Sequence, residues 1–413
     1  MARICIIRQG SFPNDPRLRR EVESLVAAGH EVDIICRRLL PSLPLYEHND
    51  LVAVRRVPLR RVAGGPFGYL LQYVAFLLIA LVLAGTLHLR RRYKLVQVNS
   101  MPDVLVFAAL VPRLFGARVL LDLHECMPEF FATKFKIGLG HPAVRFIARC
   151  EQASIGFADF AITCSAQMRE AFIDRGAPPA KVDVIVNGAN DKVFDPGQYP
   201  PRGREPGRFV LISHGTMEER YGLDTIIRAV ALVRDEIPGL RLDLYGGGAY
   251  RETLRQLASD LGLEREVYFS EGWVPMEELV QAIADADVGV VAMKRDAFRD
   301  LTLCNKMYDF IAMGKPIISS RTRSVEDYYG ESCFELFTAD DPQDLARAIR
   351  HLHADPAHRE RLVGETARVN EPYRWPHQRE RYLDIVAHLL AGERGIPAVS
   401  TAWQRRAPAH PAE

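Results

Sequence analysis

Short apolar runs alternate with longer amphipathic stretches along the whole chain. The runs of the first half are Arg3–Ile7, Glu31–Cys36, Val52–Val57, Lys94–Val98, Arg118–Asp122, Phe160–Thr163 and Val182–Val186. Those of the second half are Phe209–Ser213, Arg241–Tyr245, Val267–Ser270, Val288–Val291, Pro316–Ser320 and Cys333–Leu336. Short apolar strands separated by helices are typical of a parallel sheet that is covered on both faces. The pattern therefore predicts an α/β protein with a doubly wound domain in each half.

A break in this alternation separates the two halves. Residues 187–207 are crowded with Gly, Pro, Asn and Asp, which favour turns and linkers. We expect one domain over residues 1–195 and another over residues 206–370. A final helix is predicted within residues 373–391, and the tail at 392–413 is expected to be mobile because it has few apolar residues. Ligands of doubly wound domains lie at the carboxyl ends of the strands, so we expect a ligand cleft between the domains.

Composition and charge narrow the class of protein. With 413 residues, of which 48% are hydrophobic and 25% are charged, the chain can form two globular cores and is not a disordered or fibrous protein. The net charge of +1 hides an asymmetry, because residues 1–195 hold 25 Lys and Arg against 18 Asp and Glu. The first half is therefore the half that can meet an anionic surface. Seven cysteines without C-x-x-C spacing and the absence of a secretory signal favour a cytoplasmic protein.

One segment challenges a purely soluble interpretation. Tyr69–Leu89 is almost entirely apolar, and its length approaches that of a membrane-spanning helix. Its basic flanks are Arg55, Arg56, Arg60, Arg61, Arg90, Arg91, Arg92 and Lys94. A spanning helix would pull the next strand, Leu95–Val98, out of the sheet, so we favour contact with a membrane surface or plain core packing. The protein is then cytoplasmic, or peripheral on the inner face of the cell membrane.

Residues 303–319 combine a polar helix start with a buried strand. Asn305 and Lys306 offer donors near a helix N-terminus, where backbone N–H groups and the helix dipole favour a phosphate. Asp309 lies one turn further along and can accept hydrogen bonds from sugar hydroxyls. A plain amphipathic helix that runs into a strand explains the same segment without any ligand.

Three loops would converge with this helix at the carboxyl ends of the second-half strands. They contain, in order, Gly215, Thr216 and Arg220; Gly246, Gly247 and Gly248; and Gly272, Trp273 and Val274. The glycines permit close approach of the backbone, and the guanidinium of Arg220 suits a diphosphate. Each loop alone is weak evidence, because glycine after a strand is ordinary turn chemistry. Their recurrence at matching topological positions is a stronger indication of a binding site.

Together these segments resemble the donor domain of the retaining glycosyltransferases of family 4, also called group 1. That family has a Gly loop with a basic residue, a Gly-rich turn, a Gly-x-Val-Pro loop and an acid-containing helix before Gly-Lys-Pro. The first-half segment Gly10–Arg17 also looks like the family's first acceptor-side loop. The resemblance implies the GT-B fold, in which two Rossmann-like domains face a cleft and a C-terminal helix packs back on the N-terminal domain. It also implies metal-independent transfer of a hexose from a nucleotide diphosphate sugar, without a cofactor.

The resemblance further implies a role for each candidate residue. Arg220 and Lys306 would neutralise the leaving diphosphate, and Asp309 would hold the ribose. The two Gly-rich loops would hold the nucleotide. His124 is similar in position to the histidine that the family keeps near the transferred sugar, and Gly10 would let the backbone approach the donor phosphates.

Two features of the acidic residues need a separate interpretation. The family's usual first acid is replaced here by Leu301, and either Asp300 or Asp296 is a candidate to substitute for it. The Asp-x-Asp sequence at residues 285–287 matches a signature of metal-dependent sugar transferases. It lies at a helix end that enters the buried strand Val288–Val291, so we interpret it as a cap and turn and expect no metal there.

The remaining signals bear on partners and on rival functions. Arg17, Arg19 and Arg20 are expected to form a solvated or phosphate-facing helix start. The basic first half and the apolar helix suggest a saccharide or lipid-linked acceptor at a membrane face, as in cell-surface polysaccharide synthesis. A nucleotide-sugar epimerase of the same architecture and a non-catalytic nucleotide-sugar binding protein remain alternatives. No nucleic-acid partner is expected, because the Arg clusters lack interleaved aromatic residues.

Overall fold

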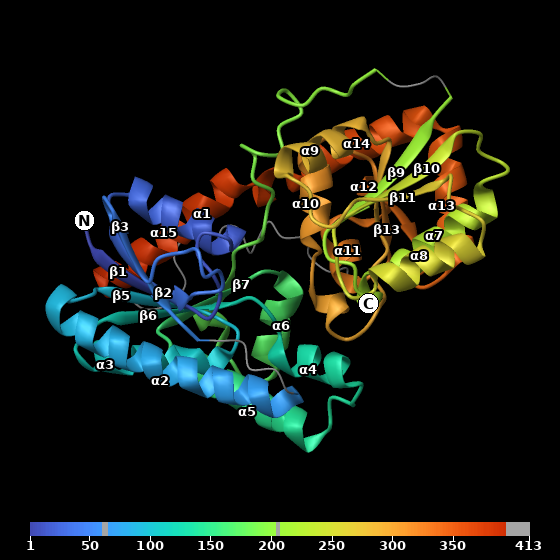
Figure 1. Cartoon of the computed structure of the whole chain (residues 1–413). Coiled ribbons are helices and arrows are strands. Elements are labelled where there is room, and N and C mark those ends of the chain that lie inside the picture. The colour runs from blue at the N-terminus through green and yellow to red at the C-terminus, as the bar shows by residue number, and fades with distance from the viewer. Residues whose placement is uncertain (60–64, 204–206, 394–413) are drawn as a thin grey trace. The chain divides into compact units, whose positions relative to one another are not determined.

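The computed structural model describes residues 1–59, 65–203 and 207–393 (Figure 1). The chain divides into two compact units, and we describe each by itself. Unit 1 comprises residues 1–186 together with the helix that follows Trp375, and unit 2 comprises Asn187–Trp375. The division falls before the linker-like segment, which belongs to unit 2. Most of the expected tail, and Arg60 and Arg61 of the expected basic flank, lie outside the described residues.

Unit 1 is built on an eight-stranded sheet with the strand order β3-β4-β2-β1-β5-β6-β7-β8. Its strands are β1 (Arg3–Arg8), β2 (Glu31–Arg37), β3 (Tyr46–Asn49), β4 (Val52–Val57), β5 (Leu95–Asn99), β6 (Arg118–Leu123), β7 (Phe160–Thr163) and β8 (Val182–Val184). The pairings are parallel except for the edge strand β3, which runs antiparallel to β4. The sequence pattern missed β3, because all four of its residues are exposed and it has no apolar alternation.

Helices cover both faces of this sheet (Figure 1). They are α1 (Pro16–Ala27), α2 (Gly65–Arg91), α3 (Leu110–Leu114), α4 (Met127–Phe135), α5 (Pro142–Phe157), α6 (Ala166–Asp174) and α15 (Trp375–Ala391). Helix α1 begins where Asp15 accepts hydrogen bonds from the N–H groups of Arg17 and Leu18, with Pro16 in its first turn. These contacts fix the direction in which α1 leaves the loop after β1.

Helix α15 brings the end of the described chain back to unit 1. The Gln378 side chain accepts a hydrogen bond from the backbone N–H of Val186 at 2.8 Å. The Tyr382 hydroxyl donates to Gln97 on the central strand β5 at 2.6 Å, and Arg381 forms a buried ion pair with Asp183. Side chains of α15 are therefore part of the polar interior of unit 1.

Unit 2 contains a six-stranded parallel sheet with the order β11-β10-β9-β12-β13-β14. Its strands are β9 (Phe209–His214), β10 (Leu240–Tyr245), β11 (Val267–Phe269), β12 (Val288–Val291), β13 (Ile317–Ser320) and β14 (Glu335–Phe337). Its helices are α7 (Leu223–Val233), α8 (Arg251–Asp260), α9 (Met276–Asp285), α10 (Asn305–Ala312), α11 (Arg323–Tyr328), α12 (Gly330–Cys333), α13 (Pro342–Ala354) and α14 (Pro356–Asn370). Cys333 was expected in a strand, but it is the last residue of α12, because the backbone becomes extended only at Phe334.

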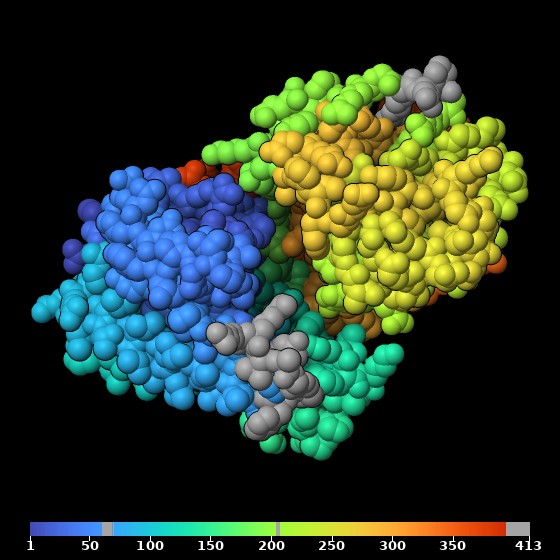
Figure 2. All heavy atoms as spheres, viewed as in Figure 1, coloured from blue at the N-terminus to red at the C-terminus, as the bar shows by residue number. Residues whose placement is uncertain are grey.

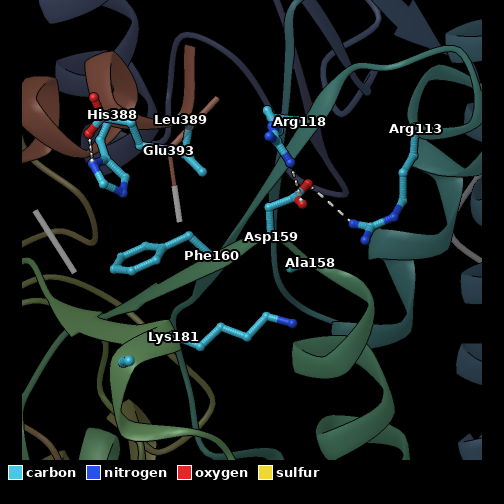
Figure 3. A pocket seen from close by; sticks show the side chains of 10 residues that line it. Arg113, Arg118, Ala158, Asp159, Phe160, Lys181, His388, Leu389 and Glu393 are labelled. Carbon is cyan, nitrogen blue, oxygen red and sulfur yellow. Dashed lines mark hydrogen bonds and ion pairs between the residues drawn. The ribbon is translucent and has the colours of Figure 1, made fainter. Parts of the chain in front are cut away.

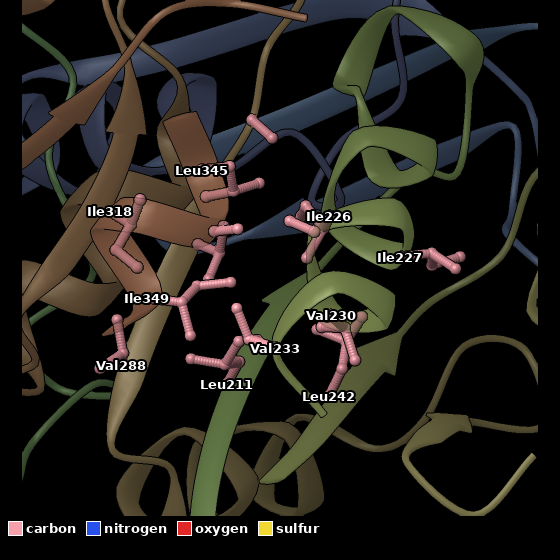
Figure 4. Close-up of a cluster of buried hydrophobic side chains, with 14 of the residues drawn as sticks. Leu211, Ile226, Ile227, Val230, Val233, Leu242, Val288, Ile318, Leu345 and Ile349 are labelled. Atoms are coloured by element: carbon pink, nitrogen blue, oxygen red, sulfur yellow. The ribbon is translucent and has the colours of Figure 1, made fainter. Parts of the chain in front are cut away.

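The core of unit 2 lies between its sheet and the helices α7 and α13. Leu211 and Val288 of the sheet are buried against Ile226 and Val230 of α7 and Ile349 of α13 (Figure 4). The spacing of the α7 residues puts them on one face of that helix. The structure thus confirms the prediction of two doubly wound α/β domains, and packing of this kind holds the strand ends of unit 2 in place.

Candidate active site

The three Gly-containing loops of unit 2 lie side by side at the carboxyl ends of β9, β10 and β11. The Gly215 N–H donates to the carbonyl of Tyr245 at 2.8 Å, and the Met217 N–H donates to the carbonyl of Gly247 at 2.9 Å. Gly246 and Gly272 form a β-bridge between the second and third loops. The three loops therefore meet, as the sequence predicted.

Two of these glycines are required by close backbone contacts. A Cβ on Gly246 would lie 2.0 Å from the carbonyl oxygen of Gly215, and the φ angle of Gly246 is +126°. A Cβ on Gly248 would lie 2.2 Å from the carbonyl oxygen of Met217. No side chain fits at either distance, so the loops can approach one another only through glycine.

Lys306 places a buried positive charge beside the first loop. It lies in the first turn of α10, its residue is 8% exposed, and its Cε would touch a Cβ on Gly215 at 3.0 Å. Its ammonium sits 4.3 Å from the centroid of the Tyr221 ring. Within the described parts of the chain no carboxylate pairs with it, and burial lowers its pKa. A buried cation without a counter-ion, at a helix N-terminus, is suited to an anion.

Arg220 shares the Tyr221 ring with Lys306. Its guanidinium carbon lies 5.2 Å from the ring centroid, and it pairs with Glu218 at 2.7 Å. Both partners of that ion pair are more than one-third exposed, so exchanging Glu218 for a bound phosphate would cost little. The structure thus places the two predicted cations around one aromatic ring. Sequence reasoning missed Tyr221, whose cation–π role depends on a lysine that is distant in the chain.

Asp309 lies one turn beyond Lys306 on α10, beside a buried histidine. His214 Nε2 is 3.6 Å from the Asp309 carboxylate, and the His214 ring packs edge-on against Phe310 at 5.2 Å. Burial, and then the positive charge of Lys306, lower the pKa of His214 to about 3. His214 is therefore neutral and adds no positive charge to the site.

The other candidates of unit 2 differ in exposure. Asn305 is exposed at the start of α10, and Thr216 is partly exposed after β9. Trp273 is 69% exposed, and its indole Nε1 lies 3.4 Å from where a Cβ on Gly247 would be. Val274 is partly exposed in the same loop. These side chains lie in the loops or at the start of α10, and none of them is part of the buried core.

In unit 1, His124 follows β6 and is held by a buried carboxylate. Its Nε2 lies 2.8 Å from Asp122, and its backbone N–H donates to the Ser100 hydroxyl at 3.0 Å. Burial works against ionisation of Asp122, but Arg17 and His124 outweigh it and keep the pKa of this carboxyl below its ordinary value. Burial also lowers the pKa of His124, which Asp122 offsets only in part. The imidazole is therefore neutral and fixed in orientation.

We expected a solvated or phosphate-facing helix start, and the solvated alternative is wrong for two of the three arginines of α1. Arg17 is 7% exposed and forms a bidentate ion pair with Asp122, at 2.9 and 2.6 Å. Arg20 is also buried, whereas Arg19 is exposed and pairs with Glu23. The reason is that Arg17 provides the counter-charge for a carboxylate that the sheet buries completely.

Gly10 lies in the loop after β1, at the same edge of the unit 1 sheet as His124. Its carbonyl accepts a hydrogen bond from the Arg37 N–H at 2.8 Å. A Cβ at this position would lie 3.2 Å from the Arg8 side chain, a tight contact with a flexible neighbour. Gly10 therefore lies at the expected edge of the sheet. A side chain at position 10 would meet only the flexible Arg8 side chain, so glycine is less strictly required there than at Gly246.

The two acids near Leu301, which replaces the family's usual first acid, have local partners. Asp300 pairs with Arg295 at 3.0 Å and accepts the Arg323 N–H, while Asp296 accepts the N–H groups of Phe298 and Arg299. Leu301 is buried. Both acids thus hold the loop before α10 together.

The Asp-x-Asp sequence at residues 285–287 lies where α9 ends and β12 begins. Asp287 accepts the Val210 N–H at 2.8 Å, and Asp285 accepts the Arg202 N–H at 2.7 Å. The sequence is therefore at a helix end, as predicted, but its two carboxylates accept hydrogen bonds from distant backbone segments and not from the cap itself.

A separate pocket of about 340 Å³ lies at the opposite edge of the unit 1 sheet (Figure 3). Arg113, Arg118 and Lys181 line it, and Asp159 pairs with both arginines at 3.2 and 3.3 Å. Asp159 precedes β7 and Arg118 begins β6, so this pocket is at the amino ends of the strands. It is remote from His124 and shares no residue with the candidate site.

The Gly246 contacts lead to a stability prediction. Gly246→Ala should lower the free energy of unfolding by about 3 kcal/mol or more, because the added methyl group meets a backbone oxygen at a positive φ. Gly247→Ala is the matched control and should cost less than about 1 kcal/mol, since its Cβ would make only ordinary contacts. Denaturant unfolding of both variants tests this, and equal effects would contradict it.

His214 gives a prediction for pH dependence. Its folded-state pKa is below the unfolded value, so the unfolded state binds the proton first and stability falls as the pH falls below about 6.5. Between pH 7 and pH 5 this residue should remove about 2 kcal/mol of stability. His214→Gln should abolish that share of the pH dependence in denaturant titrations, whereas substitution of the exposed His48 should not. A slope that is unchanged in His214→Gln would refute the buried neutral state.

Comparisons with known proteins agree with this arrangement. Residues 15–188 match the family model described as "Glycosyl transferase 4-like domain", and residues 208–355 match "Glycosyl transferases group 1". The chain is 26% identical to the sulfoquinovosyl transferase SQD2 of Arabidopsis thaliana, over 67% of this chain and 53% of the relative.

It is also 29% identical to a GDP-mannose-dependent alpha-(1-6)-phosphatidylinositol monomannoside mannosyltransferase of Mycolicibacterium smegmatis, over 60% of this chain and 66% of the relative. The matched part thus spans about half to two-thirds of these relatives. Sucrose-phosphate synthase from Thermosynechococcus elongatus has a similar fold, with a TM-score of 0.74 and 22% identity over 95% of this chain and 100% of that one. The chain belongs to the GT4-like, group 1 glycosyltransferases of the GT-B fold.

Proposed function

We propose that this glycosyltransferase transfers a hexose with retention of the anomeric configuration, and that its acceptor is a lipid-linked saccharide presented at a membrane surface. The single observation that carries the transfer step is the pair of cations, Lys306 and Arg220, around the Tyr221 ring beside the Gly loops. Departure of the sugar builds negative charge on the nucleoside diphosphate and positive charge on the anomeric carbon. Fixed cations at the diphosphate lower the barrier to that departure.

Lys306 is the stronger of the two cations in this proposal. Because it is buried and no carboxylate of the described residues pairs with it, the diphosphate would be the charge that it pairs with, and this pairing would favour its protonated form. The cost of burying the ammonium is offset only when the donor is bound. The site therefore favours the leaving group more strongly as its charge increases.

His124 is assigned to the transferred sugar. The ionised Asp122 accepts the proton on His124 Nε2, which leaves the Nδ1 lone pair as the acceptor for a sugar hydroxyl. A neutral imidazole also avoids repelling the developing positive charge on the sugar ring. In this proposal Asp309 accepts hydrogen bonds from the ribose, while the loops at Gly246–Gly248 and Gly272–Val274 contact the nucleotide.

The outer face of α2 supports a membrane-presented acceptor. The helix is long and apolar enough to cross a membrane by length and composition, and 28% of its most apolar window is buried. Its exposed apolar residues, among those described, are Leu70, Leu71, Val74, Leu78, Ile79, Val82 and Leu89. Helix α2 is part of the surface in Figure 2, where it is light blue.

Two further observations favour a helix that lies on a membrane surface. Leu114 and Phe115, which are 74% and 66% exposed, add apolar surface at the end of α3, which packs against α2. The strand β5 begins a few residues after α2 and pairs with β1 and β6 in the middle of the sheet. Inserting α2 across a bilayer would remove β5 from that position. The proposed location is therefore peripheral, on the cytoplasmic face of the membrane.

Loss of Lys306 tests the transfer step. Lys306→Ala should reduce the rate of nucleoside diphosphate release from a panel of UDP- and GDP-sugars by roughly 100-fold, since it removes a charge that acts mainly in the transition state. The melting temperature should change little. Lys192→Ala, at an exposed lysine of the same unit, is the matched control.

An unchanged rate in Lys306→Ala would contradict the assigned role. Conversion of the donor sugar without any acceptor would instead indicate an epimerase, and donor binding without turnover would indicate a non-catalytic binding protein. Both outcomes can be read from the same panel of nucleotide sugars. Analysis of the anomeric configuration of the product then tests retention.

Binding to vesicles tests the membrane surface. The wild-type protein should sediment with vesicles that contain phosphatidylglycerol, and the double variant Leu78→Glu and Val82→Glu should not, because it places two charges on the apolar face. Leu232→Glu, at an exposed leucine of α7, is the control and should bind like the wild type. Wild-type protein that stays in the supernatant would overturn this part of the proposal.

A further inference from the structure

Two histidines and a glutamate from three different elements of unit 2 converge on one point. Glu335 is buried at the start of β14, His351 lies on α13 and His358 lies on α14. Glu335 Oε2 is 3.0 Å from His351 Nδ1 and 3.1 Å from His358 Nε2. The two imidazole rings stack with their centroids 4.5 Å apart. A single carboxylate oxygen therefore faces one nitrogen of each ring.

We propose that Glu335, His351 and His358 bind a divalent transition-metal ion of the Zn²⁺ class. The three ligand atoms lie within 4.8 Å of one another. Two imidazole nitrogens and one carboxylate oxygen are a ligand set that Zn²⁺ takes at about 2.0–2.2 Å, with water in its remaining position. His351 has about half of its side chain exposed, so it can rotate toward the ion and leaves a path for the ion to enter.

Neighbouring contacts hold the ligands in orientation. Arg347 pairs with the other oxygen of Glu335 at 2.6 Å and is itself held by Asp344 at 2.6 Å. This leaves Oε2 of Glu335 turned toward the histidines. Asp355 accepts the N–H of His358 at 2.8 Å and so fixes the first turn of α14. Such outer contacts orient metal ligands and raise affinity by reducing the reorganisation on binding.

The position of the cluster indicates a structural role for the ion. Glu335 is the first residue of β14, whereas the donor loops follow the last residues of β9 and β10. All strands of this sheet are parallel, so the cluster lies at the edge opposite to Lys306 and the Gly loops. An ion here would link β14, α13 and α14 and would not contact the groups assigned to sugar transfer.

Metal binding by the whole protein tests the proposal. After dialysis against a chelator, the wild type should bind one equivalent of Zn²⁺ in calorimetry, and Co²⁺ should give visible absorption bands typical of a nitrogen and oxygen site. Saturating Zn²⁺ should raise the melting temperature by several degrees, because only the folded state presents the three ligands together. Glu335→Gln and His358→Ala should each weaken binding by at least 10-fold.

His351→Ala serves where the other variants fold poorly, since it leaves the contact of Glu335 with Arg347 intact. His48→Ala, at an exposed histidine of unit 1, should bind like the wild type. The proposal is overturned if wild-type protein binds neither ion, or if binding persists in His351→Ala and Glu335→Gln. Sugar transfer by the chelator-treated wild type should be unchanged, so a failure of this inference is distinguishable from a failure of the proposed function.

Discussion

The buried ammonium of Lys306 is the constraint on which the candidate site depends. A charge taken out of water costs free energy unless another charge or a polar surface compensates it. Here the Tyr221 ring and the N-terminal end of α10 surround Lys306, and in the described chain no carboxylate neutralises it. The Gly loops approach one another closely beside this cation, as the backbone contacts of Gly246 and Gly248 show.

In unit 1, by contrast, the buried charges near His124 are paired with one another. Arg17, Asp122 and His124 form a compensated group in which every charge has a partner. Glu21 extends this group by accepting hydrogen bonds from Gln97 and Asn99, at 2.7 and 3.0 Å. A compensated network orients its members but has little charge left over for a ligand. This difference suits the proposed division of labour, in which unit 2 neutralises a leaving group and unit 1 positions a neutral sugar.

Short continuous apolar runs predicted most of the strands, because parallel strands that are buried on both faces have apolar residues at nearly every position. Two elements show the limits of that signal. The edge strand β3 has no apolar side to reveal it, and its contacts with β4 are backbone hydrogen bonds together with polar contacts such as the ion pair of Glu47 with Arg56. The segment at Cys333 is apolar enough for a strand but forms the end of α12, since local apolarity does not distinguish a buried helix end from a buried strand.

For the site, the sequence by itself determined the Gly loops, Lys306, Arg220 and Asp309. The positions of glycine and proline and the spacing of charged residues are local features that can be identified from the sequence without a structure. Only the tertiary structure decided that the Tyr221 ring contacts both cations, and that Arg17 turns inward to Asp122. It also brought Glu335, His351 and His358 to one point. These are contacts between residues from separate elements, and their distances depend on how sheets and helices pack, which no local pattern of residues encodes.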